Sequence, residues 1–150
     1  VKPSPNLPNA KAVNLYPSLC LFEGTNISIG RGTDYPFQQF GSPYLKSNYS
    51  FIPKSTIGSR KPKHENKKCY GFDLKHEETF HNSLNLNWII YCYNNTTDKE
   101  KFFNNFFDKL AGTDKLRKQI INGLSEDEIK ENWKKDLYEF KKIRKKYLLY

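Results

Sequence analysis

The feature that most constrains the fold is an apolar run followed directly by a glycine-rich polar loop. Residues 19–22 are Leu-Cys-Leu-Phe, which has the length and composition of a short buried strand. In the loop that follows, at residues 23–33, Gly24, Gly30 and Gly32 allow positive φ angles or the close approach of a ligand. We therefore expect a scaffold that presents residues 23–33 as a binding or catalytic loop.

Polar side chains between these glycines are the first candidates for a functional site. They are Glu23, Asn26, Ser28, Arg31 and Thr33. Gly, Asn, Ser and Thr also form ordinary turns, so the composition alone fits a structural role equally well. The loop is not a phosphate-binding loop, because Arg31 stands where that motif requires lysine. Glu23 and Arg31 are not needed to build a turn, and together they can hold a polar substrate.

Length and charge set the outer limits on function. The 150 residues suit one domain, and a chain that begins at Val1 and has no methionine is expected to be a fragment or a processed chain. No apolar run approaches the roughly 20 residues of a membrane-spanning helix. The net charge is +9, and residues 1–75 hold most of it, with 11 Lys/Arg and 4 Asp/Glu. A basic surface favours nucleic acid, anionic lipid or acidic glycan, although many such charges only keep a surface solvated.

The basic residues of the first half gather at residues 54–68, which we expect to form a loop. Lys63 and His64 lie within it and are candidate contacts for an anionic ligand. A single histidine is more often structural than functional, so that reading stays open for His64. The segment is expected to lead into a half-buried strand.

Cysteine spacing gives no sign of a metal site. Cys20, Cys69 and Cys92 are far apart and match no zinc-binding pattern. Each has apolar or aromatic neighbours, so buried free thiols are expected, with one disulfide in an exported protein as the alternative. The sequence signals no cofactor.

The remaining periodicity predicts an α+β fold, with a small mixed or antiparallel sheet packed by C-terminal helices. Residues 1–18 carry four prolines and are expected to be extended. Strands are predicted at residues 49–53 and 68–76, and Phe37 and Phe40 are predicted to lie in the core. Helices are predicted at residues 79–93, where a strand is the alternative for the second half, at 102–110 and at 113–121.

The last element has the clearest helical signal. Ser125 and Glu128 form a capping box, and Gly123 can end the preceding helix in the left-handed conformation. One apolar face is formed by Ile129, Trp133, Leu137 and Phe140. Residues 147–150 are apolar, and we expect this end of the chain to dock on the body.

The two helices around Gly123 also resemble a helix-turn-helix motif of DNA-binding proteins. A recognition helix needs basic and amide side chains near its N-terminus. Residues 126–128 are Glu-Asp-Glu, which would repel phosphates. We therefore expect no nucleic-acid partner, and a DNA affinity that depends steeply on salt would show the opposite.

The polar loop and its surroundings resemble the NamZ-type exo-β-N-acetylmuramidases, a family long catalogued as a domain of unknown function. The most specific match is the motif at residues 21–26 together with Ser28 and residues 30–33. Supporting matches follow in order along the whole chain: Pro36-Phe37, residues 41–43, Lys63, Cys69, Gly71, Gly112, the Trp133 helix and residues 144–150.

The resemblance implies that residues 1–150 are a single C-terminal domain of a two-domain enzyme whose N-terminal Rossmann-like domain is absent from this chain. It implies hydrolysis of terminal β-linked N-acetylmuramic acid from peptidoglycan fragments, in a cleft near the domain junction. The best-supported catalytic glutamate of the family belongs to the first domain. Peptidoglycan-derived muramic acid glycans and the N-terminal domain are the implied partners, and an exported, periplasmic or cell-envelope location is implied by the substrate.

Within this framework the polar loop is expected to supply half of a site. Glycosidases generally use two carboxyl groups, and Glu23 is the only acidic residue in the first 33 positions, so it is the candidate catalytic residue or substrate acceptor. Arg31 suits a bidentate grip on the lactyl carboxylate of muramic acid. The other expected substrate contacts are Asn26, Ser28, Thr33, Lys63 and His64. The alternative is a non-catalytic glycan-binding or docking domain.

Overall fold

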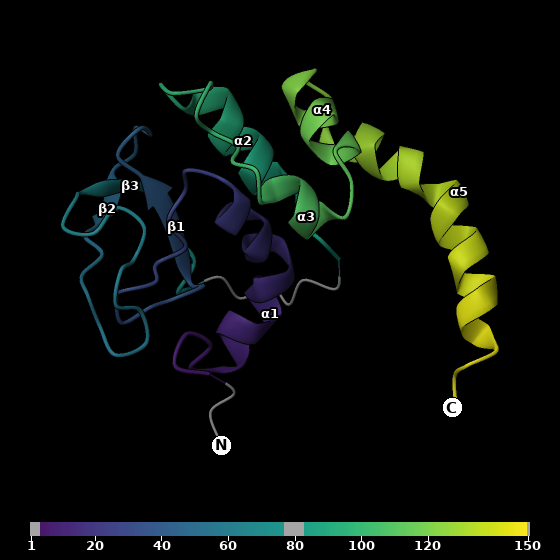
Figure 1. The fold of residues 1–150 in the computed structure, drawn as a ribbon, viewed down its shortest axis with the longest axis horizontal. Coiled ribbons are helices and arrows are strands. Elements are labelled where there is room, and N and C mark those ends of the chain that lie inside the picture. The colour runs from purple at the N-terminus through teal and green to yellow at the C-terminus, as the bar shows by residue number, and fades with distance from the viewer. Residues whose placement is uncertain (1–3, 77–82, 150) are drawn as a thin grey trace.

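The computed structural model describes residues 4–76 and 83–149, and it confirms the α+β class. Figure 1 shows a small sheet at one end of the molecule, helices beside it, and a long last helix that extends away. In chain order the elements are α1 (Ala10–Leu19), the 3-10 helix η1 (Cys20–Gly24), β1 (Gln39–Ser42), β2 (Tyr49–Phe51), β3 (Cys69–Asp73), α2 (Asn87–Asn95), α3 (Phe107–Ala111), α4 (Lys115–Ile121) and α5 (Glu126–Lys145).

The sheet is antiparallel with strand order β1-β3-β2. β2 and β3 confirm the strands predicted at residues 49–53 and 68–76, although both are shorter, and β1 was not predicted. Gly71 of β3 faces Gly41 of β1, and a Cβ at Gly71 would overlap the Phe40 carbonyl, which explains the glycine. On the other edge of β1, Ser28 and Gly41 exchange two backbone hydrogen bonds of 2.7 and 2.9 Å. The polar loop is therefore fixed to the sheet by its own backbone.

The predictions for the first 24 residues are wrong at two places. Residues 10–19 form a helix rather than an extended segment, and residues 19–22 form the end of α1 and the start of η1 rather than a strand. The side chain of Asn9 caps α1 by accepting the Ala12 N–H at 2.9 Å. Ala12, Leu15 and Leu19 share the three- and four-residue spacing that buries one helix face, and this outweighs the cost of Pro17 inside the helix.

The core is aromatic and lies between the sheet and the helices. Phe37 and Phe40 are fully buried, as predicted, and the Phe40 ring stacks on Phe22 and Phe72 with centroids 5.0 and 5.1 Å apart. Offset stacking of this kind adds to the area that each ring buries. Because Phe22 belongs to η1, the core holds the start of the polar loop in place.

The helical predictions need three adjustments. α2 begins at Asn87, so the second half of the 79–93 prediction is helix and not strand, while residues 79–82 lie outside the described part. Only Phe107–Ala111 is helical within 102–110, because residues 102–106 form a turn that buries the Phe102 ring. α4 starts at Lys115, two residues inside the predicted range of 113–121, and Gly123 has the predicted positive φ, of 80°.

The start of α5 is confirmed in detail. Ser125 Oγ accepts the Glu128 N–H, and the Glu128 carboxylate accepts the Ser125 N–H at 2.8 Å. Glu126 reaches across to α2, where its Oε1 accepts the Leu86 N–H at 2.8 Å. The first turn of α5 is thereby tied to its own backbone and to a neighbouring helix.

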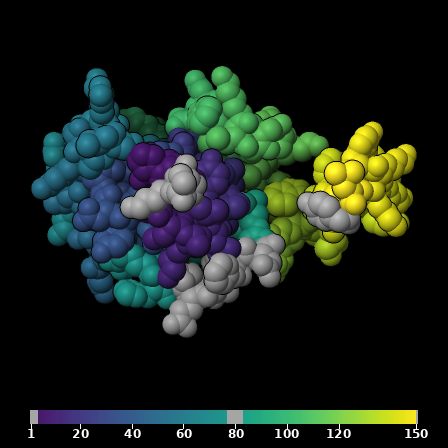
Figure 2. Space-filling model, turned by 90° about the horizontal axis from the view of Figure 1, so that it is seen from below, coloured from purple at the N-terminus to yellow at the C-terminus, as the bar shows by residue number. Residues whose placement is uncertain are grey.

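The far part of α5 departs from the prediction. Ile129 is fully buried, but Leu137 and Phe140 are 49% and 59% exposed, so the predicted apolar face packs only near its beginning. Tyr147 and Leu149 are more exposed still, and the expectation that this end docks on the body is wrong for this chain. Figure 2 shows the yellow end of α5 standing apart from the body.

Two further results concern membranes and thiols. Among the described helices, none has both the length and the apolar character needed to cross a bilayer. Cys20, Cys69 and Cys92 are free thiols, as expected, and the last two are buried. Burial raises the pKa of Cys69 to about 12, which keeps this thiol protonated at neutral pH.

Candidate functional site

The polar loop begins within the last two residues of η1, Glu23 and Gly24, and contacts the chain just before and at the start of α3. Gly24 lies against the backbone of Phe107, where a Cβ would overlap it, so only glycine fits. The Gly24 carbonyl accepts the Asn104 N–H at 2.9 Å, and the Asn26 N–H donates to the Phe102 carbonyl at 2.7 Å. These contacts fix the backbone directly after Glu23.

Four of the predicted site residues line one hollow of about 140 Å³. They are Glu23, Ser28, Arg31 and Lys63, with Ile27 and Ile29 completing the wall. The residues come from η1, the polar loop and the basic loop, so the fold brings together segments 40 residues apart. The hollow combines both signs of charge with an apolar wall, which suits a polar ligand that has an apolar face.

Glu23 and Arg31 form an ion pair across this hollow. The distance from Arg31 Nη2 to Glu23 Oε1 is 2.8 Å, and each side chain is about one-third exposed. The guanidinium carbon also lies 5.1 Å from the centre of the Phe37 ring, which is within the range of a cation–π interaction. A guanidinium has five N–H donors, so Arg31 can hold Glu23 and still bind an anion.

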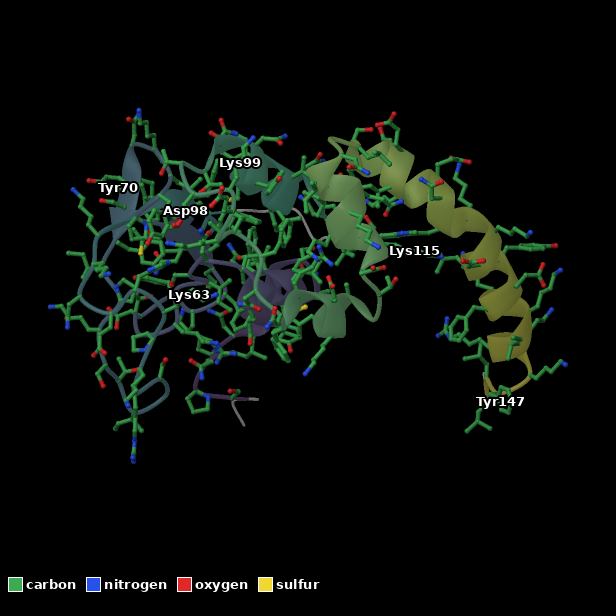
Figure 3. The ribbon with its side chains drawn as sticks, turned by 45° about the horizontal axis from the view of Figure 1, so that its top comes forward. Lys63, Tyr70, Asp98, Lys99, Lys115 and Tyr147 are labelled. Atoms are coloured by element: carbon green, nitrogen blue, oxygen red, sulfur yellow. The ribbon has the colours of Figure 1, made fainter. Side chains whose placement is uncertain are left out.

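Lys63 holds the loop rather than pointing freely into solvent. Its ammonium donates to the carbonyls of Phe22 at 3.2 Å, of Glu23 at 3.5 Å and of Thr25. Desolvation lowers the pKa of Lys63 to about 8, although the charge of Glu23 opposes the shift. Figure 3 shows Lys63 inside the loop-rich half of the molecule. Lys63 was predicted to contact substrate, but these hydrogen bonds support a role in positioning the loop.

His64 braces the same loop one residue further on. Its Nε2 lies 2.6 Å from the Asn26 carbonyl, and because a carbonyl only accepts, Nε2 carries the proton. Burial lowers the pKa of His64, while the bond to Asn26 acts in the opposite direction. His64 itself has a positive φ of 60°, a backbone state that only strong local contacts hold.

The three hydroxyl and amide candidates, Ser28, Thr33 and Asn26, have different surroundings. Ser28 lines the hollow, and its Oγ accepts the Gly30 N–H at 3.4 Å. Thr33 does not line it: its Oγ1 donates to the Gly30 carbonyl at 2.7 Å and accepts from Gln39 Nε2 at 2.6 Å, which closes the turn. Both amide atoms of Asn26 are buried without a hydrogen-bond partner in the described part of the chain.

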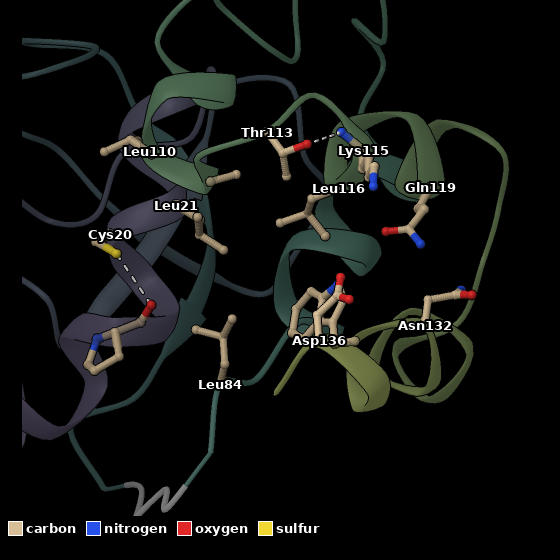
Figure 4. A pocket seen from close by; sticks show the side chains of 13 residues that line it. Cys20, Leu21, Leu84, Leu110, Thr113, Lys115, Leu116, Gln119, Asn132 and Asp136 are labelled. Atoms are coloured by element: carbon tan, nitrogen blue, oxygen red, sulfur yellow. Dashed lines mark hydrogen bonds between the residues drawn. The ribbon is translucent and has the colours of Figure 1, made fainter. Parts of the chain in front are cut away.

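Sequence reasoning missed a second and larger hollow of about 740 Å³. Figure 4 shows it between η1, α3, α4 and α5, with Cys20, Leu21, Leu116 and Asp136 among its walls. Its residues are spread over more than 100 positions in the sequence, so no local motif marks it. Among residues 4–76 and 83–149, no group of three or more His, Cys, Asp or Glu side chains could hold a metal ion.

Fold and hollow together define a class of protein, a small α+β domain that presents a charged, glycine-rich loop. The family comparison is more specific. The profile described as the C-terminal part of the exo-β-N-acetylmuramidase NamZ matches residues 14–150. The chain therefore belongs to the NamZ C-terminal family, which confirms the resemblance seen in the motif.

Relatives of known name or structure agree. Over its full length the chain is 36% identical to the peptidoglycan β-N-acetylmuramidase NamZ of Bacillus subtilis (strain 168), of which it covers 40%. A crystal structure of a DUF1343 family protein from Bacteroides fragilis NCTC 9343 is 50% identical, with a TM-score of 0.93 over 99% of this chain and 43% of that one.

A second DUF1343 family protein of the same organism, 19% identical with a TM-score of 0.65, shares the fold over all of this chain and 45% of its own. The chain thus spans less than half the length of each of these three relatives.

Proposed function

We propose that this domain is the C-terminal part of an exo-acting glycoside hydrolase that releases terminal β-linked N-acetylmuramic acid from peptidoglycan fragments. The observation that carries the proposal is the Glu23–Arg31 pair at the hollow, within a chain 36% identical to a named peptidoglycan β-N-acetylmuramidase. The domain contributes substrate contacts to a cleft that it shares with the remainder of a longer protein.

Each group at the hollow has a chemical task in this proposal. Arg31 binds the lactyl carboxylate of muramic acid with the N–H groups that its pair with Glu23 leaves over. Glu23 accepts hydrogen bonds from sugar hydroxyls or serves as the second carboxylate of the reaction. Ser28 adds a hydroxyl at the wall of the hollow. Lys63 and His64 act through the loop backbone, and Asn26 is left as a candidate reader of the acetamido group.

The first test compares hydrolysis of a chromogenic β-N-acetylmuramide by this chain and by the longer protein that carries it. Activity only in the longer protein is the expected result, because the proposal divides the site between two domains. Activity in neither would overturn the muramidase proposal. Activity in this chain alone would place the whole machinery here and make Glu23 the leading catalyst.

A variant of Glu23 separates catalysis from binding. In the longer protein, we expect Glu23→Gln to lower kcat by about 10²-fold or more, as for other groups that act on a transition state. Arg31→Ala should instead raise KM for a ligand that carries the lactyl group and leave a lactyl-free N-acetylglucosaminide unaffected. Full affinity for muramic acid in Arg31→Ala would remove the clamp.

The second candidate function is a non-catalytic glycan-binding or docking domain. The observation that favours it is the ion pair, because Arg31 already engages one carboxylate oxygen of Glu23. Under this function Glu23→Gln spares turnover in the longer protein and weakens only glycan binding.

The peptidoglycan substrate also implies that the longer protein is exported. This location is part of the proposal, and cell fractionation tests it directly.

A further inference from the structure

The exposed part of α5 continues a stripe that the body covers at its beginning. Ile129 is fully buried and Trp133 is partly buried against the core. One and two turns later, Leu137 and Phe140 are about half exposed, and Ile143 and Tyr147 follow at 55% and 77%. We call Leu137, Phe140, Ile143 and Tyr147 the α5 stripe. Spacing of three and four residues places it on the side of α5 that faces the body at Ile129.

The larger hollow adjoins this stripe. Trp133 and Asp136 of α5 line it on one side, and Leu21 of η1 and Leu116 of α4 line it on others. Figure 4 shows Leu21, Leu84 and Leu116 directed toward the space between the helices. Stripe and hollow therefore form one surface that leads from the body onto the protruding helix. Its apolar residues are joined in the hollow by polar walls at Lys115, Gln119 and Asn132. A row of exposed apolar side chains on one helix face, continued by a hollow, is typical of an interaction site.

The relatives indicate what covers it. More than half of the 50% identical Bacteroides structure lies outside the matched part, so family members carry a large additional region. The first described residues, from Ser4, and the end of α5 lie on the same lower side of Figure 1, and both are in view in Figure 2, which looks from below. A domain that precedes this one would enter on the side of the molecule toward which the end of α5 extends.

The charges around the α5 stripe indicate what kind of partner surface would fit it. Residues 134–146 contain seven Lys/Arg and two Asp/Glu. A covering surface should therefore have an apolar centre with carboxylates at its rim. A second copy of this chain would bring seven like charges to the same place, which disfavours self-association.

We propose that the α5 stripe and the adjoining hollow are the docking surface for the preceding domain of the longer protein. The inference rests on the two-domain part of the proposed function and not on its chemistry. Docking buries Phe140 and Leu137, closes the hollow over η1, and places the preceding domain on the helix that carries Glu23.

A labelling experiment tests the surface without using catalysis. Phe140→Cys and its control Tyr138→Cys are each made in a Cys20→Ser background, in this chain and in the longer protein, and maleimide labelling rates are measured. Phe140 and Tyr138 are 59% and 61% exposed but point to different sides of α5. We expect labelling at position 140 to slow by about tenfold or more in the longer protein, with position 138 unchanged.

Two results would overturn the proposal. Equal labelling rates at position 140 in both lengths would mean that nothing docks on the stripe. Protection of position 140 in this chain alone that rises with protein concentration would assign the stripe to a second copy. Because no readout uses substrate, a protein that hydrolyses no muramide still gives a clear answer, and the two proposals fail separately.

Phe140→Glu gives an independent check. It should leave the unfolding temperature of this chain nearly unchanged, because more than half of the Phe140 side chain is already exposed, and lower that of the longer protein. Tyr138→Glu should affect neither. A loss of stability in this chain equal to that in the longer protein would contradict docking.

Discussion

Lys63 shows how one residue can shape a candidate site by holding the backbone of another segment. An ammonium placed among three carbonyls at the end of η1 draws the Phe22–Thr25 backbone together and so sets the direction of Glu23. The sequence marks Lys63 only as one charge in a basic loop. Its role depends on carbonyls that lie about 40 positions earlier in the chain, and no local pattern reports them.

The pKa of Lys63 gives a prediction on stability. In the folded chain the pKa is about 8, against 10.5 for an unperturbed lysine, so between these pH values the unfolded state binds more protons. The contribution of Lys63 to the free energy of unfolding should therefore rise as pH increases from 8 to 10.5, by up to roughly 3 kcal/mol. Below pH 8 the desolvation penalty is fully present.

Urea denaturation at pH 7.0 and 9.5 of the native chain and Lys63→Met measures this contribution. The difference in unfolding free energy between the two should change in favour of the native chain at the higher pH. Lys67→Met is the matched control, because Lys67 is exposed in the same loop. A native-minus-Lys63→Met difference that is independent of pH would show that burial does not lower the pKa of Lys63.

At the scale of elements, α5 contains two parts with different support. The capping box and Glu126 fix its first turn, and Ile129 inserts into the core. Beyond Trp133 the helix is maintained by its own hydrogen bonds and by surface ion pairs such as Lys142–Glu139, each of which contributes little. The same apolar periodicity therefore has different energetic value along one helix.

This division predicts that two similar substitutions in α5 lower the unfolding free energy by very different amounts. In this chain Ile129→Ala should lower the unfolding free energy by about 2–5 kcal/mol, because it leaves a cavity in the core. Leu137→Ala, in the half-exposed part of the stripe, should change it by about 0.5 kcal/mol or less. Thermal or urea denaturation measures both. A large effect of Leu137→Ala would mean that the end of α5 packs on the body in solution.

The contrast between α1 and residues 19–22 is also an effect at the scale of elements. Four apolar residues in a row fit a buried strand or a helix end equally well, and the pattern favours neither. What decides is that Leu19 completes the buried face of α1 and Phe22 stacks on Phe40 of β1. The prolines at 3, 5 and 8 precede the Asn9 cap, so they do not obstruct the helix.

At the scale of the whole molecule, the body and the end of α5 should differ in resistance to proteolysis. Trypsin cuts chains that can open locally, and residues 134–146 combine seven Lys/Arg with little tertiary packing. We expect the first cuts within this segment, leaving a stable fragment that ends near it. Mass spectrometry after brief digestion identifies the sites. First cuts in the basic loop at 54–68 would show that the loop is less well held than its hydrogen bonds suggest.

By itself the sequence determined the features set by near neighbours: the capping box at Ser125, the left-handed Gly123, the β2 and β3 strands and the family motif around Glu23. These depend on contacts within a few residues or on pattern alone. Only the tertiary structure decided that Arg31 pairs with Glu23, that Lys63 and His64 brace the loop, and that the α5 stripe leaves the body. Those outcomes depend on which residues, far apart in the sequence, lie close together in the fold, because burial and charge pairing are properties of the packed chain.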